Sequence, residues 1–216
     1  MSRTRRIGHT CLVTSDVATT FAVAGRSFVE LVDLLPGDGW DGPGLGEWNL
    51  KSLVGHTSRS LITVINYLQQ PAAAEEVPSA AVYYQLSSRL IAAGPAAVTE
   101  RGRQAGVALG ENPVATIRRL YDEAITAVSA VADDPVITTI VGGMRLSRYL
   151  PTRTFELTVH SLDIAAATGL DITPPAAALH EALHLAADVA LLRGDGARLL
   201  LGLTGRTSLP AGYSIV

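Results

Sequence analysis

The sequence predicts a mainly α protein, built as a four-helix bundle with a small C-terminal α/β appendage. Hydrophobic residues make up 48% of the 216 residues but aromatic residues only 5%, so the apolar content is mostly Ala, Leu and Val, which pack well between helices. Four long segments repeat apolar residues at helical spacing. Glycine- and proline-containing segments separate them, which is typical of helix bundles.

The first two long helices have clear boundaries. Ser15 is a candidate N-cap for the first helix, which Pro36-Gly37 ends. A polar loop rich in glycine and proline covers residues 36–47. Asn49 then caps the second helix, predicted from Leu50 to about Gln70. Trp48 and Leu53 are expected to form a hydrophobic staple, which fixes how the loop enters the second helix.

The middle of the chain is less regular. Residues 71–80 form a linker of proline, alanine and glutamate, and residues 81–109 predict one or two shorter helices interrupted at Gly94-Pro95. Asn112-Pro113 combines an N-cap with a proline at the first helical position. A third long helix is expected from there to about residue 132.

A short hairpin and the fourth long helix follow. The β-branched run 136–141, Gly142-Gly143 and residues 144–146 predict two strands and a turn. Ser147 is the expected cap of the fourth helix, and Gly169 is placed for its C-terminal cap. Residues 1–170 are therefore interpreted as the bundle.

The last part, residues 171–216, is interpreted as the appendage. Pro174-Pro175 opens a fifth helix that runs to about Leu192. After a glycine turn, residues 198–203 and 213–216 are expected to form two short strands. This unit is expected to pack on the bundle.

Charge and composition exclude several classes of protein. A net charge of −3 and a pI of about 5.9 argue against nucleic-acid binding, and the cluster Arg3, Arg5 and Arg6 is too short to change this. No segment is expected to span a membrane, and residues 1–10 are not followed by the apolar run of a signal peptide. The single Cys11 excludes an internal disulfide and favours a cytoplasmic protein. A homodimer is left open.

The chemistry is expected on the fourth long helix. Glu156 and His160 are four residues apart, so both lie on one face, and the helical wheel places them in the middle of the buried arc. An unpaired carboxylate there would be costly, which predicts a cation, hydrogen-bond donors or a metal ion beside it. His56 on the second helix completes a His, Glu, His set that would leave a metal with an open position. Zinc suits these ligands, as do iron, nickel and manganese. The alternative for His56 is a core or surface histidine hydrogen-bonded to a neighbour.

A second histidine motif competes with this site. His180, Glu181 and His184 match the H-E-x-x-H pattern of zinc metalloproteases. On a helical wheel, however, these residues fall with Asp188 on a solvated face, opposite an apolar face that includes Leu183. Only a short tail remains to provide a third ligand, so we expect the motif to be coincidental.

Two stretches carry a family resemblance. GEWNLKSLVGHTS at 46–58 and RTFELTVHSLDIAAATGL at 153–170 together resemble the mycothiol-dependent maleylpyruvate isomerase family, within the DinB-like metalloenzyme superfamily. The closing LLLGLTGRTSLP is similar to the family's C-terminal strand. The resemblance implies a DinB-like bundle with a divalent metal, usually zinc, on His56, Glu156 and His160. It also implies mycothiol as a co-substrate and a small electrophile as the second substrate.

Further site residues are candidates around these three. Asp163 is expected to orient His160 or to be a surface carboxylate. Arg153 is expected to pair with Glu156 or with a substrate carboxylate, and Arg59 to bind a substrate carboxylate, the alternative for both arginines being an exposed position. Arg206 is similar to the family's C-terminal Gly-Arg, which implies a cation near the substrate, although the C-terminal portion is shorter than in the isomerase. The pocket above the metal is expected to be lined by Ser60, Thr63, Tyr67, Tyr149 and Arg153.

Two functions follow from these residues. The first is a metal-dependent enzyme that uses a thiol for transfer to, or cis-trans isomerisation of, a small electrophile. Cys11 is not expected to be the nucleophile, because no base lies near it in the sequence. The second is a non-catalytic metal-binding or regulatory bundle. A pocket plugged by bulky apolar side chains would favour the second.

Overall fold

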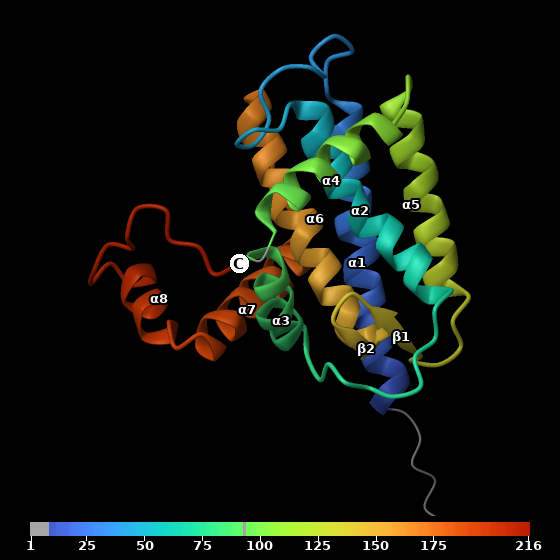
Figure 1. Ribbon diagram of the computed structural model, residues 1–216, viewed down its shortest axis with the longest axis vertical. Helices are drawn as coiled ribbons and strands as arrows, with labels where there is room; N and C mark the ends of the chain where they lie inside the picture. Colours follow the sequence, from blue (N-terminus) through green and yellow to red (C-terminus); the bar gives the residue numbers. More distant parts are fainter. Residues whose placement is uncertain (1–8, 93) are drawn as a thin grey trace, which may run out of the picture.

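The computed structural model describes residues 9–92 and 94–216 and is mainly helical (Figure 1). Its helices are α1 His9–Asp33, α2 Leu50–Leu68, α3 Ala80–Ala92, α4 Pro95–Ala108, α5 Pro113–Ser129, α6 Leu146–Thr168, α7 Ala176–Leu192 and α8 Gly196–Leu203. Its strands are β1 Val136–Thr139 and β2 Gly142–Arg145. The arginines at positions 3, 5 and 6, the segment considered as a signal peptide and the side chain of Cys11 lie outside the described residues. The predicted mainly α class is confirmed.

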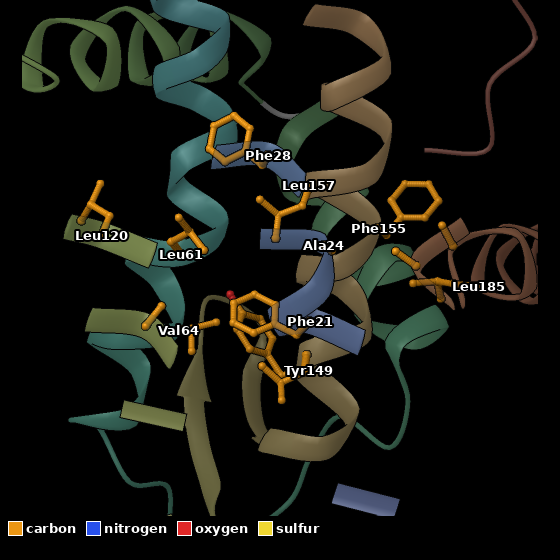
Figure 2. Close-up of a cluster of buried hydrophobic side chains, with 14 of the residues drawn as sticks. Phe21, Ala24, Phe28, Leu61, Val64, Leu120, Tyr149, Phe155, Leu157 and Leu185 are labelled. Atoms are coloured by element: carbon orange, nitrogen blue, oxygen red, sulfur yellow. The ribbon is translucent and has the colours of Figure 1, made fainter. Parts of the chain in front are cut away.

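Four helices form the central bundle, as predicted. α1, α2, α5 and α6 pack in a ring in which α1 and α2 each contact both α5 and α6. Figure 2 shows apolar side chains from all four of these helices converging on one core, among them Phe21, Phe28, Leu61, Leu120 and Leu157. Burial of large apolar side chains of this kind stabilises the fold by about 1.5–3 kcal/mol each.

Helix boundaries follow from local capping, with two corrections. The Asn49 side chain accepts a hydrogen bond from Ser52 N, and Gly169 has the left-handed φ of 70° expected of a C-terminal cap. Ser15 is not the N-cap of the first helix, because α1 already begins at His9 and no glycine or proline interrupts the intervening residues. Ser147 does not cap α6 either. Asp134 does so, accepting from both the backbone N and the hydroxyl of Ser147.

α4 packs tightly across α2. The two helices approach so closely at Gly55 and Gly106 that a Cβ on Gly55 would lie 2.3 Å from the backbone N of Gly106. Gly102 gives similar room to Trp48, whose indole Nε1 donates to Thr99 O at 2.9 Å. The α3–α4 region, only loosely defined by the sequence, therefore forms one side of the molecule beside α2 and α6.

The predicted hairpin is confirmed and is held by the preceding linker. β1 and β2 pair antiparallel, with Ile137 opposite Met144. The linker runs alongside: Thr138 N donates to Gln70 O, and Ala72 N donates to Val136 O. The first strand of the hairpin is thereby fixed against the chain that follows α2.

The expected C-terminal strands are wrong. Residues 198–203 lie in α8, and residues 213–216 form no strand. A helix satisfies its own backbone hydrogen bonds, whereas an isolated strand needs a paired neighbour, and this segment has none among the described residues. α7 packs against α6, α3 and α1, while α8 contacts α7 and extends away from the bundle (Figure 1). A domain boundary near residue 170 stays a prediction.

No described helix is long and apolar enough to cross a membrane.

Candidate metal centre

Three side chains from two helices converge at one point. His56 comes from α2, and Glu156 and His160 come from successive turns of α6. Each provides one ligand atom, and the three atoms all lie within 4.8 Å of one another. No other set of three His, Cys, Asp or Glu residues meets this criterion among the side chains that the structure describes. The packing of α2 against α6 therefore creates the grouping that the sequence only suggested.

The position of the pair on α6 differs from the prediction. The fully buried face of α6 includes Leu157 and Ile164, whereas Leu162 on another side of the helix is 41% exposed. Glu156 and His160 thus lie at the edge of the buried face, with side chains 22% and 15% exposed. The face shared with α1 and α2 decides which side of α6 is buried. The edge position leaves the pair accessible from a pocket.

The Glu156 carboxylate and His160 imidazole form a charged pair. His160 Nε2 lies 3.1 Å from Glu156 Oε2, and His160 Nδ1 lies 2.9 Å from Asp163 Oδ2. Burial opposes the charged forms, but hydrogen bonds from His160 and the charge of Arg153 hold the pKa of Glu156 at about 2. The two carboxylates outweigh burial at His160 and raise its pKa to about 9. Asp163 therefore contacts His160, which is the arrangement needed for a carboxylate that orients this ring.

His56 stands in a different environment. Its ring stacks on Trp48 with centroids 4.4 Å apart and meets the His160 ring edge-on at 5.0 Å. Burial and the nearby His160 lower its pKa to about 4, so the imidazole is neutral at pH 7. Its Nδ1 is buried and has no hydrogen-bond partner among the described residues. A neutral ring with an unpartnered nitrogen is a suitable metal ligand.

Tyr84, which sequence reasoning missed, completes the surroundings of Glu156. Its hydroxyl donates to Glu156 Oε1 at 2.6 Å, and it lies in α3, outside the four-helix bundle. Burial, followed by the charge of Glu156, raises the pKa of Tyr84 well above its usual value, so the phenol stays protonated. The periodicity of α3 marks Tyr84 only as a core residue, and no sequence signal links it to Glu156.

The donor set fits a divalent metal ion. One neutral imidazole with an unpartnered nitrogen, one carboxylate and a second imidazole oriented by a carboxylate are the groups found in open zinc sites. In the described residues, Glu156 Oε1 is occupied by Tyr84, so Oε2 is the oxygen left facing His160. A single metal could therefore take one atom from each of the three side chains.

A cavity of about 550 Å³ opens above this point. Its lining includes the expected Arg59, Ser60, Thr63, Tyr67 and Arg153, together with His56 and Glu156. It also includes residues that the sequence analysis did not place there: Tyr83, Tyr84, Ser87, Leu90, Gly94, Ala97, Val98, Arg101 and Ile140. Most of these come from α3 and α4, whose docking the sequence does not determine.

Arg153 is a buried cation inside this cavity. Only 8% of the residue is exposed, and its guanidinium lies over the rings of Tyr149 and Tyr83 at 5.0 and 5.6 Å. Its Nε donates to Thr152 Oγ1 at 2.9 Å. Burial opposes its charge, but the neighbouring phenols and Glu156 raise its pKa further above the usual value. The exposed alternative for Arg153 is therefore wrong.

Two predicted residues lie elsewhere. Tyr149 is fully buried and donates to Thr63 Oγ1 at 2.9 Å, so it supports the pocket wall and does not line it. Arg206 follows α8, is exposed, and donates to Thr204 O. α8 extends away from the bundle, so Arg206 is not among the residues lining the cavity (Figure 1).

The H-E-x-x-H motif does not form a comparable group. His180 and His184 on α7 are exposed, as predicted. Two details of the helical wheel were wrong: Leu183 is 58% exposed, and Glu181 is half-buried, with Thr154 of α6 beside its carboxylate. Glu181 thus points into the α6–α7 interface, while the histidines face solvent.

Comparison with known proteins identifies a family. A family model described as the mycothiol maleylpyruvate isomerase N-terminal domain matches residues 21–165. No curated protein and no solved structure matches the chain. The matched span contains His56, Glu156 and His160 and ends within α6.

Proposed function

This chain belongs to the mycothiol maleylpyruvate isomerase N-terminal domain family, and from that premise we propose that it is a metal-dependent enzyme using a low-molecular-weight thiol. The thiol is mycothiol. The enzyme either transfers it to a small electrophile or uses it to catalyse the cis-trans isomerisation of that electrophile. The observation that carries the proposal is the convergence of ligand atoms of His56, Glu156 and His160 within 4.8 Å of one another, next to an open cavity that His56 and Glu156 line.

The three side chains would hold a divalent metal, with zinc as the first choice. Bound there, the metal would leave one position open and lower the pKa of a thiol at that position. Asp163 keeps the His160 ring oriented, and Tyr84 keeps the Glu156 carboxylate oriented. Trp48 covers one face of His56.

The cavity residues would bind and activate the electrophile. In isomerisation, the thiolate sulfur bonds to one carbon of a cis double bond, and the π electrons move to the neighbouring carbon and its carbonyl. Rotation follows, and the same electron pair re-forms the double bond as the thiolate leaves. In transfer, the adduct takes up a proton instead. Arg153 is placed to stabilise the negative charge of this adduct or a substrate carboxylate.

Metal content and thiol consumption test the proposal together. Purified protein should contain about one divalent metal per chain. It should isomerise maleylpyruvate only when mycothiol is present, without net loss of the thiol, or should consume mycothiol with a bimane. His56→Ala and His160→Ala should lose both properties, whereas His184→Ala, on the exposed face of α7, should keep both. Full metal content and activity in the first two variants would contradict the site.

The alternative is a non-catalytic metal-binding or regulatory bundle. The cavity is lined by arginines, hydroxyl groups and tyrosines and is not plugged by apolar side chains, which supports the enzymatic proposal. Tight metal binding without thiol-dependent activity across a broad panel of electrophiles would favour the alternative. The thiol, the electrophile and a homodimer remain predictions.

A further inference from the structure

We propose that the cavity takes an amphiphilic substrate, with an anionic group at its cationic floor and an apolar substituent of several carbons at its mouth, where Leu90 and Ile140 set the length preference. The inference rests on the proposed function in one respect, since it takes this cavity as the electrophile site. It adds a substrate class and two specificity residues.

The floor of the cavity is cationic. Arg153 is almost fully buried, and Arg59, which is half-buried, lines the same cavity. Neither arginine forms an ion pair with a carboxylate among the described residues, whereas the arginines of the surface pairs, such as Arg118 with Asp33, do. The charge of Glu156 acts on Arg153 without a direct ion pair in the described residues. A buried guanidinium that lacks such a direct contact is poorly solvated, so an anion that reaches it replaces lost hydration. The anionic end of the ligand therefore belongs at Arg153.

The mouth of the cavity is apolar. Leu90, near the end of α3, is 55% exposed, and Ile140, at the turn between β1 and β2, is 59% exposed. Both line the cavity, and Ala97 and Val98 of α4 add apolar surface to the same lining. A single exposed leucine is ordinary, but two aliphatic side chains from different elements at one opening form a surface that a ligand can cover.

The mouth is also rigidly placed on the hairpin side. In the linker of residues 71–80, Glu76 N and Val77 N donate backbone hydrogen bonds to Gly143 O, at 2.8 and 2.9 Å, next to the turn that carries Ile140. Thr139 Oγ1 closes the turn by donating to Gly142 O and accepting from Val141 N. A preformed apolar contact loses little entropy when a ligand binds.

Tyrosine rings connect the two ends. Tyr67 and Tyr83 line the cavity, and Tyr83 also lies under the Arg153 guanidinium. Cavities of roughly 300–1,000 Å³ accommodate drug-sized ligands. A volume of about 550 Å³ therefore leaves room beyond a four- or five-carbon electrophile, and the unfilled part is the apolar end.

Straight-chain carboxylates from butyrate to decanoate test the inference by calorimetric titration of the purified protein. They do not react with thiols, so the measurement does not depend on turnover. The dissociation constant should fall about threefold for each added methylene group between hexanoate and decanoate. Leu90→Ser and Ile140→Ser should each flatten this dependence and leave butyrate binding within about twofold of the unmodified protein.

Two controls separate the outcomes. Leu34→Ser removes a similarly exposed leucine, 64% exposed and outside the cavity lining, and should leave the chain-length dependence unchanged. Alkylammonium ions of the same length should not bind. Affinity independent of chain length, or equal effects of Leu34→Ser and Leu90→Ser, overturns the inference. Chain-length-dependent binding without any thiol-dependent turnover upholds it and contradicts the proposed enzyme instead.

Discussion

The hydroxyl of Tyr84 donates a hydrogen bond of 2.6 Å to Oε1 of Glu156, linking α3 to the carboxylate on α6. The phenol has a second acceptor nearby, Thr152 O at 3.2 Å, so both of its hydrogen-bond acceptors belong to α6. This contact fixes which carboxylate oxygen faces His160. An element outside the bundle thereby controls the geometry of the candidate metal centre.

Tyr84→Phe is expected to weaken metal binding by about 10- to 100-fold, the usual effect of losing a hydrogen bond to a ligand. Competition with a chromophoric chelator measures the affinity. Tyr83→Phe is the matched control, because Tyr83 is the adjacent residue, is equally buried and makes no hydrogen bond to Glu156 in the described residues. Equal affinities of the two variants would show that Tyr84 has no role at the metal.

Metal affinity should rise with pH. The pKa of His160 is raised to about 9, and a metal must displace its proton, whereas Glu156 and His56, with pKa values of about 2 and 4, are already deprotonated at pH 7. Affinity should therefore increase about tenfold per pH unit from 7 to 9 and then level off. At pH 7, one proton should be released for each metal ion bound, and calorimetry in two buffers with different ionisation enthalpies measures this number. If no proton is released, His160 is not protonated in the metal-free protein.

The metal-free protein should show the opposite trend in stability. The raised pKa of His160 contributes stability that is fully present below its unfolded value of about 6.5 and is lost as pH rises through about 9. The lowered pKa of Glu156 contributes stability present above about 4.5 and lost as pH falls through about 2. The pair should therefore contribute most to the free energy of unfolding between pH 4.5 and 6.5. Denaturant unfolding of the protein after its metal has been removed with a chelator measures this contribution. The same contribution should vanish in His160→Ala.

Arg153→Gln should impair anionic substrates selectively. Because Arg153 is buried in the cavity without a carboxylate partner, we expect KM for maleylpyruvate to rise about tenfold or more, with little change for an uncharged bimane. Arg26→Gln is a matched control, since Arg26 also lies over a tyrosine, Tyr121, but is outside the cavity lining. A parallel loss with both electrophiles would assign Arg153 a structural role only.

Gly55→Ala should destabilise the fold by about 3 kcal/mol, because the added methyl group meets the backbone of α4 and one of the two helices must shift. Gly37→Ala, where nothing lies within 4 Å of the added Cβ, should change the free energy of unfolding by less than about 0.5 kcal/mol. Denaturant titration of both variants measures the difference. Because Gly55 precedes His56, the first variant should also bind metal more weakly.

Local signals in the sequence are sufficient to predict the four bundle helices and the hairpin, and to select three candidate ligands. Asn49, Asn112 and Gly169 act at helix ends as predicted, since a cap depends on its own neighbours. The spacing of Glu156 and His160 places them on one face by helix geometry alone. Family resemblance, carried by two short stretches, agrees with the family match.

Only the tertiary structure decides the rest, because it depends on contacts between segments distant in sequence. Which face of α6 is buried follows from its packing on α1 and α2, and this moves Glu156 and His160 from the middle of the buried arc to its edge. The docking of α3 and α4 brings Tyr84 to Glu156 and supplies the cavity mouth, and the same long-range packing leaves Arg206 outside it. Periodicity describes one helix at a time, so it points to the candidate ligands but not to the groups that surround them.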